Sequence, residues 1–206
     1  MSYYAVKKGY KPGIYNTWEE CKKNVNGFKR AEFKKFKNID NAKNFINITE
    51  ENKIEDYDII IYTDGGCINN GKKNAKASIG VYFGKNDNRN ISSRINGKQT
   101  NNTAEIKAII KAIKIVKLEL KKNKKVLIYS DSRYAIRCCK DYGEKMNKID
   151  WKKDIPNKNL VKKVYLLCKK FKNLNFKYIK AHTNNDDIHS KGNDMADKLA
   201  SKALED

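Results

Sequence analysis

Two apolar runs that each lead to an aspartate constrain the fold of this chain most. Residues 58–64 read DIIIYTD, and residues 126–131 read VLIYSD. Continuous apolar runs of this length are typical of strands that are buried on both faces of a sheet. We therefore predict two central strands that each end at an aspartate, Asp64 or Asp131, with both carboxylates at the same edge of the sheet.

The other apolar segments complete a mixed pattern of helices and strands. Apolar residues recur at helical spacing over 106–116, and Ala196, Leu199 and Ala203 share one face of a helix near the C-terminal end. We also expect strands at 78–83, 91–95 and 176–179, and helices at 132–139 and 159–171. This order predicts an α/β domain in which helices flank the sheet.

Two further acids can join the aspartates at the strand ends. Glu105 falls in the first turn of the helix over 106–116, and Asp197 adjoins the apolar face of the last helix. Four unbalanced carboxylates in one place would repel one another and raise their pKa values, and a divalent cation removes the conflict. Carboxylate oxygens favour hard ions such as Mg²⁺, and a pair of such ions suits phosphodiester displacement. Any one of these acids alone is more often a turn or cap residue.

A short acidic stretch divides the chain. Residues 1–48 carry a net charge of +7, residues 49–56 carry −3 and residues 57–206 carry +17. We therefore predict a small basic module, a linker over 49–56 and a larger domain. In the small module we expect strands at 3–7 and 14–15, a helix that Thr17 caps together with Glu20 and that ends near Gly27, and a second helix from Asn41.

The charge of the whole chain indicates its class of partner. Lysine and arginine number 45 against 24 aspartates and glutamates, which gives +21 at pH 7. A basic chain of this kind has nucleic acid as its default partner. No window approaches the length of a membrane span, and the first residues lack the pattern of a signal peptide. We expect an intracellular protein of the cytoplasm or nucleus that has no membrane partner.

Four short motifs resemble the successive blocks of type 1 ribonuclease H. They read YTDGGC at 62–67, TNNTAE at 100–105, YSDS at 129–132 and GNDMAD at 192–197. The resemblance covers 57–206 and implies a ribonuclease H-like fold, a five-stranded mixed sheet whose first three strands are antiparallel. It implies hydrolysis of the RNA strand of RNA/DNA hybrids by two-metal-ion catalysis with Mg²⁺, or Mn²⁺ as an alternative, leaving 5′-phosphate and 3′-hydroxyl ends. The catalytic and metal-binding carboxylates would then be Asp64, Glu105, Asp131 and Asp197.

The same resemblance assigns residues around the acids. Beside the RNA strand it places Cys67, Asn70, Asn101 and Asn102, although the asparagines before the helix could equally serve as caps. In a pocket for a DNA-strand phosphate it places Thr100 and Asn157, with Lys98 as a less certain member.

A loop histidine of the family matches His182, which would move a proton or assist product release. The loop from His182 to Asp197 is longer than is usual in the family and contains His189 as an alternative. Many relatives also carry an extra helix and a basic loop that grip the hybrid. We expect too little room for them between Tyr142 and Asn159, and we expect Trp151 to be a packing residue.

The first module resembles the hybrid-binding domain that precedes some enzymes of this type. By that similarity Tyr4, Trp18 and Phe33 would contact the duplex, and Lys34 and Lys35 would hold phosphates. The alternative is that Trp18 and Phe33 fill a small core. The partner would be an RNA/DNA hybrid, with double-stranded RNA as a weaker ligand, and we expect a monomer.

Two other functions stay open at this point. One is a catalytically silent hybrid-binding protein, because no sequence proves that metal binds. The other is a DNA nuclease of the same fold. Intact acids at all four positions disfavour the first, and the asparagines together with the hybrid-binding module disfavour the second.

Overall fold

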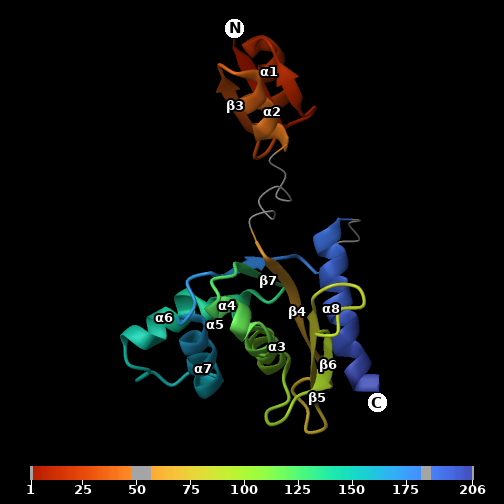
Figure 1. Ribbon diagram of the computed structural model, residues 1–206, viewed down its shortest axis with the longest axis vertical. Coiled ribbons are helices and arrows are strands. Elements are labelled where there is room, and N and C mark those ends of the chain that lie inside the picture. The colour runs from red at the N-terminus through yellow and green to blue at the C-terminus, as the bar shows by residue number, and fades with distance from the viewer. Residues whose placement is uncertain (1, 48–56, 182–186, 206) are drawn as a thin grey trace. The chain divides into compact units, whose positions relative to one another are not determined.

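The chain forms two compact units, residues 1–56 and residues 57–206 (Figure 1). The computed structural model describes residues 2–47, 57–181 and 187–205. The predicted linker over 49–56 lies outside the described residues. The two units are therefore described separately.

The N-terminal unit is a small sheet with two helices. Its antiparallel strands have the order β2-β1-β3, with β1 at Tyr3–Lys8, β2 at Gly13–Tyr15 and β3 at Glu32–Phe36. Helix α1 (Trp18–Val25) begins at the expected capping box, in which Thr17 and Glu20 bond to each other's backbone nitrogens. Helix α2 is Ile39–Asn47. A small core forms from Val6, Cys21 and Val25.

The larger unit contains the expected five-stranded mixed sheet. Its strand order is β6-β5-β4-β7-β8, in which β4, β5 and β6 are antiparallel and β7 and β8 run parallel to β4. The strands are β4 (Ile59–Ile68), β5 (Lys76–Tyr82), β6 (Ile91–Arg94), β7 (Val126–Ser130) and β8 (Leu174–Tyr178).

Helices cover both faces of this sheet. The helices are α3 (Asn101–Ile115), α4 (Lys117–Lys121), α5 (Arg133–Cys139), α6 (Asp141–Lys148), α7 (Lys158–Cys168) and α8 (Ile188–Glu205). Helix α8 packs on β4, β5 and β6, while α3 covers the opposite face with α5 and α7 behind it (Figure 1). Alternation along the central strands serves both layers, because Ile61 and Ile128 pack toward α3 whereas Tyr62 and Tyr129 pack with Ala196 of α8.

Two expectations about these elements are wrong. Strand β4 does not end at Asp64 but continues to Ile68 and pairs with β5 along that extension. The segment after Asp131 does have room for an additional helix. Only Lys140 separates the end of α5 at Cys139 from the start of α6 at Asp141. Trp151, which follows α6, is 4% exposed and belongs to the core, as expected.

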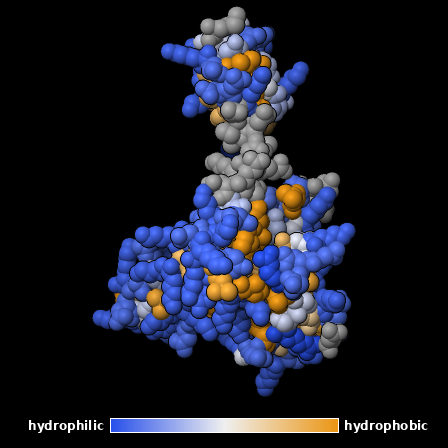
Figure 2. Space-filling view, viewed as in Figure 1, coloured by the Kyte–Doolittle hydropathy of each residue, from blue (hydrophilic) through white to orange (hydrophobic). Residues whose placement is uncertain are grey.

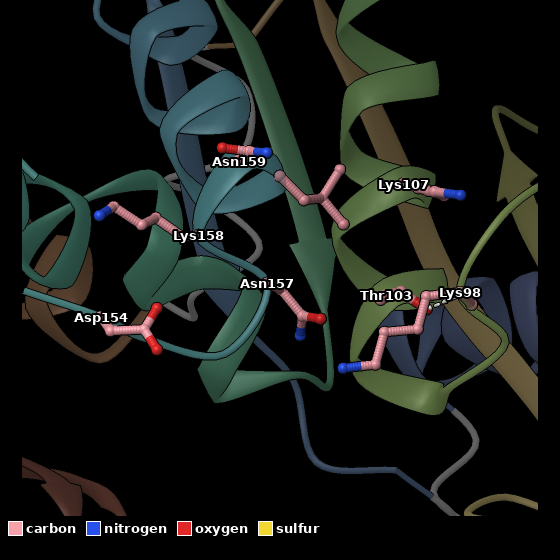
Figure 3. A pocket seen from close by; sticks show the side chains of 8 residues that line it. Lys98, Thr103, Lys107, Asp154, Asn157, Lys158 and Asn159 are labelled. Atoms are coloured by element: carbon pink, nitrogen blue, oxygen red, sulfur yellow. Dashed lines mark hydrogen bonds between the residues drawn. The ribbon is translucent and has the colours of Figure 1, made fainter.

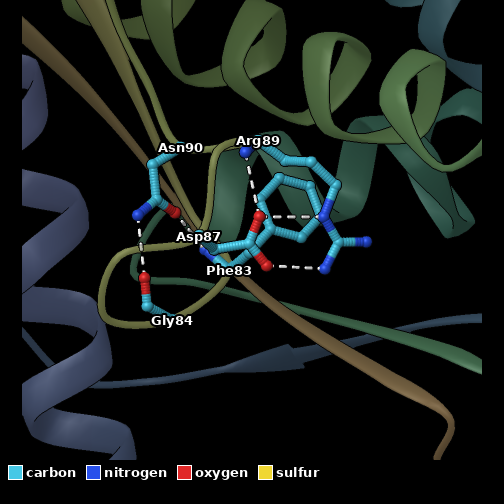
Figure 4. A network of polar contacts seen from close by, with 5 residues as sticks. All are labelled: Phe83, Gly84, Asp87, Arg89 and Asn90. Carbon is cyan, nitrogen blue, oxygen red and sulfur yellow. Dashed lines mark hydrogen bonds and ion pairs between the residues drawn. The ribbon is translucent and has the colours of Figure 1, made fainter.

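A polar network closes the loop between β5 and β6 (Figure 4). The carboxylate of Asp87 accepts hydrogen bonds from the Nε and Nη2 atoms of Arg89 at 3.0 and 2.7 Å. The Arg89 guanidinium lies 4.5 Å from the ring centre of Phe83, and Asn90 bonds to the backbone of Phe83 and Gly84. These contacts fix the turn that joins the two strands.

Hydrophilic residues cover most of the visible surface (Figure 2). Within 2–47, 57–181 and 187–205, no helix is both long enough and apolar enough to span a bilayer.

Candidate active site

Parallel pairing of β4 with β7 brings the two aspartates together. Thr63 of β4 is the register partner of Ser130, the last residue of β7. An aspartate follows each member of this pair. Asp64 within β4 and Asp131 just beyond β7 therefore lie side by side. The expectation that both carboxylates meet at one place in the sheet is confirmed, although only Asp131 follows a strand end.

Close packing of α3 against β4 brings Glu105 to the same place. A side chain at Gly65 would overlap the backbone nitrogen of Glu105, so a residue without Cβ is needed there. Thr100 and Thr103 form a capping box that fixes the start of α3. Glu105 therefore lies in the first helical turns, directly beside Asp64.

Helix α8 brings the fourth acid from the opposite face. A side chain at Gly80 would overlap the carbonyl oxygen of Ala196, so α8 runs against the backbone of β5 at this point. The residue after Ala196 is Asp197, which is half-buried and forms a hydrogen bond with Asp64.

The acid cluster is compact and buried. Asp64, Glu105 and Asp131 each offer a carboxylate oxygen, and these oxygens all lie within 4.8 Å of one another. Asp64 is 6% exposed and Glu105 is 4% exposed. The Oε2 atom of Glu105 is buried and has no hydrogen-bond partner among the described residues.

Burial and mutual repulsion both act on the protonation of the cluster. Burial, followed by the charges of Asp131 and Asp197, raises the pKa of Asp64 to about 7. Burial, followed by the charges of Asp64 and Asp131, also raises the pKa of Glu105 well above its ordinary value. Three converging carboxylate oxygens, and a buried Glu105 oxygen that lacks a hydrogen-bond donor, fit a hard divalent cation, whose charge would remove the repulsion.

Short polar side chains gather at the start of α3. The Oδ1 atom of Asn70 accepts a hydrogen bond from the backbone nitrogen of Asn101 at 3.3 Å and one from Cys67 Sγ at 3.6 Å. Asn101 and Asn102 are exposed in the first turn of α3. The predicted RNA-side residues thus come from the end of β4 (Cys67), the β4–β5 connection (Asn70) and the start of α3 (Asn101 and Asn102), which lie together.

A cavity of about 480 Å³ lies between α3 and the start of α7 (Figure 3). Of the predicted phosphate ligands, Asn157 and Lys98 line it. Thr100 is not a lining residue, but its hydroxyl lies 3.0 Å from the hydroxyl of Thr103, which is one. Sequence reasoning missed the other lining residues: it gave no role to Thr103, although Thr103 lies in the motif at 100–105, and no motif marks Lys107, Asp154, Lys158, Asn159 and Leu160.

In the N-terminal unit, three aromatic rings form a row. The ring centre of Trp18 lies 5.8 Å from that of Tyr4 and 5.7 Å from that of Phe33. Trp18 and Phe33 are 40% and 42% exposed, so they do not fill the core. The Lys35 ammonium lies 5.3 Å from the ring centre of Tyr4, and Lys34 is exposed on the same strand, β3.

Comparison with known proteins identifies the family. The sequence profile described as RNase H matches residues 56–205, and the profile described as ribonuclease H1 N-terminal domain matches residues 2–46. The chain belongs to the ribonuclease H family. Both resemblances read from the sequence motifs are thereby confirmed.

Relatives of this ribonuclease H span both units. A Schizosaccharomyces pombe protein named ribonuclease H is 29% identical over 264 residues, covering 97% of this chain and 96% of the relative. A Saccharomyces cerevisiae protein of the same name is 31% identical over 245 residues, covering 98% of this chain and 68% of the relative. Ribonuclease H1 of Mus musculus is 29% identical over 215 residues, covering 76% of this chain and 75% of the relative.

Solved structures agree on the fold of the larger unit. A metagenomic ribonuclease H1 from compost, LC11-RNase H1, is 27% identical with a TM-score of 0.50, covering 71% of this chain and 95% of that chain. The RNase H domain of prototype foamy virus is 24% identical with a TM-score of 0.57, covering 71% of this chain and 94% of that chain.

Of the two histidines, the structure places only His189. His182, the favoured loop histidine, lies outside the described residues. His189 is not in a loop but is the second residue of α8. Its Nδ1 atom lies 2.8 Å from the Tyr62 hydroxyl, and its ring stacks on Tyr129 with centres 4.5 Å apart. His189 therefore helps to fix the start of α8 on the sheet.

Proposed function

We propose that this chain is a two-domain endoribonuclease that cuts the RNA strand of RNA/DNA hybrids and leaves 5′-phosphate and 3′-hydroxyl ends. The observation that carries the proposal is the convergence of Asp64, Glu105 and Asp131 within 4.8 Å in a chain of the ribonuclease H family. The family relation supports cleavage of RNA in hybrids, and two-metal-ion catalysis is general in the family.

Asp64, Glu105, Asp131 and Asp197 would hold two Mg²⁺ ions, with Mn²⁺ as a substitute. When bound, such ions activate water toward the phosphorus and stabilise the departing 3′ oxygen. The chain itself supplies four carboxylates from different elements, of which the two most deeply buried exclude solvent from the site. Their raised pKa values favour the protonated forms without a cation, so we expect metal binding to release protons.

Selectivity for RNA would come from the polar residues beside the acids. A protein distinguishes RNA from DNA by contacts to the 2′-hydroxyl. Asn70, Asn101, Asn102 and Cys67 offer short donors and acceptors at the start of α3, next to Glu105. We assign them to the RNA strand.

The DNA strand would be held by the cavity between α3 and α7. Lys98, Lys107 and Lys158 supply positive charge there, and Asn157 supplies a neutral donor. The Thr103 hydroxyl donates to the carbonyl oxygen of Lys98 at 2.7 Å, so Thr103 helps to shape the cavity wall. Thr100 would act through its contact with Thr103. This set suits one phosphate of the DNA backbone.

The N-terminal unit would bind the same hybrid. The exposed rings of Trp18 and Phe33 and the half-buried ring of Tyr4 offer flat apolar area, and Lys34 and Lys35 offer charge beside it. Aromatic area combined with cations suits contact with DNA sugars and phosphates. A monomer that resides in the cytoplasm or nucleus stays a prediction, as does a catalytic role for His182.

Cleavage of an end-labelled RNA/DNA hybrid tests this function, with duplex RNA and duplex DNA as controls, each with Mg²⁺ and with EDTA. We expect Mg²⁺-dependent cleavage of the hybrid alone. The Asp131→Asn variant should bind hybrid but leave it intact. Cleavage of duplex DNA would favour a DNA nuclease of this fold, and binding without cleavage by the unaltered chain would favour a silent binding protein.

A further inference from the structure

A second groove adjoins the phosphate cavity along α3. It has a volume of about 360 Å³ and lies between α3, α7 and the β5–β6 edge of the sheet. Lys107 and Leu160 line both this groove and the phosphate cavity, so the two spaces are neighbours that meet at these residues.

The groove concentrates positive charge without a counter-charge. Lys107, Lys111 and Lys114 of α3 and Lys163 of α7 line it, and none of its described lining residues is a carboxylate. The backbone of β6 also borders the groove at Arg94, but the Arg94 guanidinium adds no charge there, because its Nε atom donates a hydrogen bond of 3.0 Å to the carbonyl oxygen of Ala203 in α8, on the opposite face of the sheet. A surface of this kind attracts a chain of phosphates.

Two of these cations repel each other. Partial burial and, to a smaller degree, the positive charge of Lys163 lower the pKa of Lys107. Lys107 also donates to the backbone carbonyl of Asn96 in the groove, which holds its ammonium in place. An anion bound between Lys107 and Lys163 would relieve their repulsion.

Apart from Asn96, the rest of the lining is aliphatic. Ile79, Ile95 and Ile110 form the floor and are each less than a tenth exposed, whereas Leu160 is half-buried and offers more apolar area. A double helix turns its phosphates outward and its bases inward, so it would use only the cations. A single strand also exposes sugars and bases, which can lie against Leu160 while the lysines hold its phosphates.

We propose that this groove binds single-stranded DNA that continues the DNA strand of the hybrid beyond the phosphate cavity. The inference rests on the proposed function, because it takes the cavity at Asn157 as the point where the DNA strand is held. It adds a second binding site for a DNA overhang, on a face of α3 that does not contain the acid cluster.

The test compares hybrid probes by fluorescence anisotropy with the full chain carrying Asp131→Asn. The probes are a blunt hybrid, the same hybrid with a DNA overhang of about eight nucleotides at either end, and the same hybrid with an RNA overhang. We expect at least one DNA overhang to lower Kd about threefold or more and to steepen the slope of log Kd against log salt by about 0.7 for each phosphate contacted.

The double variant Lys111→Glu/Lys163→Glu should lose the affinity gained from the DNA overhang. It should bind the blunt hybrid with the same Kd as a control double variant. The control is Lys121→Glu/Lys172→Glu, which changes two exposed lysines outside the groove by the same charge. The milder pair Lys111→Gln/Lys163→Gln keeps the test valid if charge reversal disturbs folding, which circular dichroism would reveal.

Three results would overturn the inference: no gain from any DNA overhang, an equal gain from an RNA overhang, or a gain that survives both groove variants. Failure of the unaltered chain to bind or cut the blunt hybrid would instead refute the proposed function. Binding and cleavage of the blunt hybrid without an overhang effect would refute the groove alone.

Discussion

Replacing Asp64 with asparagine removes a buried charge and keeps the shape of the side chain. Burial and the charges of Asp131 and Asp197 raise the pKa of Asp64 to about 7. In an unfolded chain the pKa of an aspartate is about 4. Without metal, the folded protein therefore binds this proton more tightly than the unfolded chain does.

The sign and size of the effect follow from that difference. The free energy of unfolding of the metal-free wild type should fall as the pH rises from about 4 to about 7, and should change little from this group outside that range. The two pKa values differ by an amount worth about 4 kcal/mol. Asp64→Asn should thus be more stable than wild type at pH 8, by up to about 4 kcal/mol. Near pH 4 the two proteins should be equally stable.

Urea unfolding in EDTA at pH 4 and at pH 8 measures the difference in stability between Asp64→Asn and wild type. Fluorescence of Trp151, which is 4% exposed, follows the catalytic unit, whereas Trp18 is already 40% exposed. Asp87→Asn is the matched control, because the hydrogen bonds from Arg89 lower the pKa of Asp87 to about 2 and its replacement should destabilise at pH 8. A loss of stability in Asp64→Asn at pH 8, or a gain as large at acid pH, would refute the reasoning.

Three further predictions concern packing and binding. Gly65→Ala should lower the free energy of unfolding in urea by about 1 to 3 kcal/mol and reduce hybrid cleavage, because its Cβ would push α3 away from β4. Unchanged stability and cleavage rate would contradict this. Trp18→Ala should weaken hybrid binding about tenfold in anisotropy titrations, whereas Tyr10→Ala, an exposed ring outside the aromatic row, should not; equal effects would count against the row. Asn157→Ala should weaken binding about tenfold without changing the salt slope, because the amide is neutral, and a changed slope would argue against its assigned contact.

The sequence predicted most elements of the larger unit because their apolar periodicity is strong. The runs at 58–64 and 126–131 gave the two central strands, and the isoleucines of 106–116 gave α3. It did not predict that β4 continues past Asp64. Gly65-Gly66 reads as a turn, yet these glycines stay in the strand because α3 approaches its backbone there, a contact that exists only in the folded structure.

Sequence analysis missed elements whose residues show no regular alternation of apolar and polar side chains. Strand β3 has four exposed residues and one half-buried residue, so its sequence carries no period of two. Helix α6 is mostly polar and begins without a side-chain cap, so no start signal marked it. The acid cluster could be predicted because chemistry and motif agree at each acid, whereas the lysines around the phosphate cavity and groove, apart from Lys98, are marked by no motif or family resemblance.

The burial of the cysteines has a practical consequence. Cys21, Cys138, Cys139 and Cys168 are buried, and Cys67 is half-buried beside Asn70, next to the start of α3. A thiol-directed dye would therefore attach at one natural position without any engineering. Cys67 is itself one of the residues assigned to the RNA strand, so bound hybrid should slow the reaction of this thiol with the dye, and the labelling rate would report substrate occupancy.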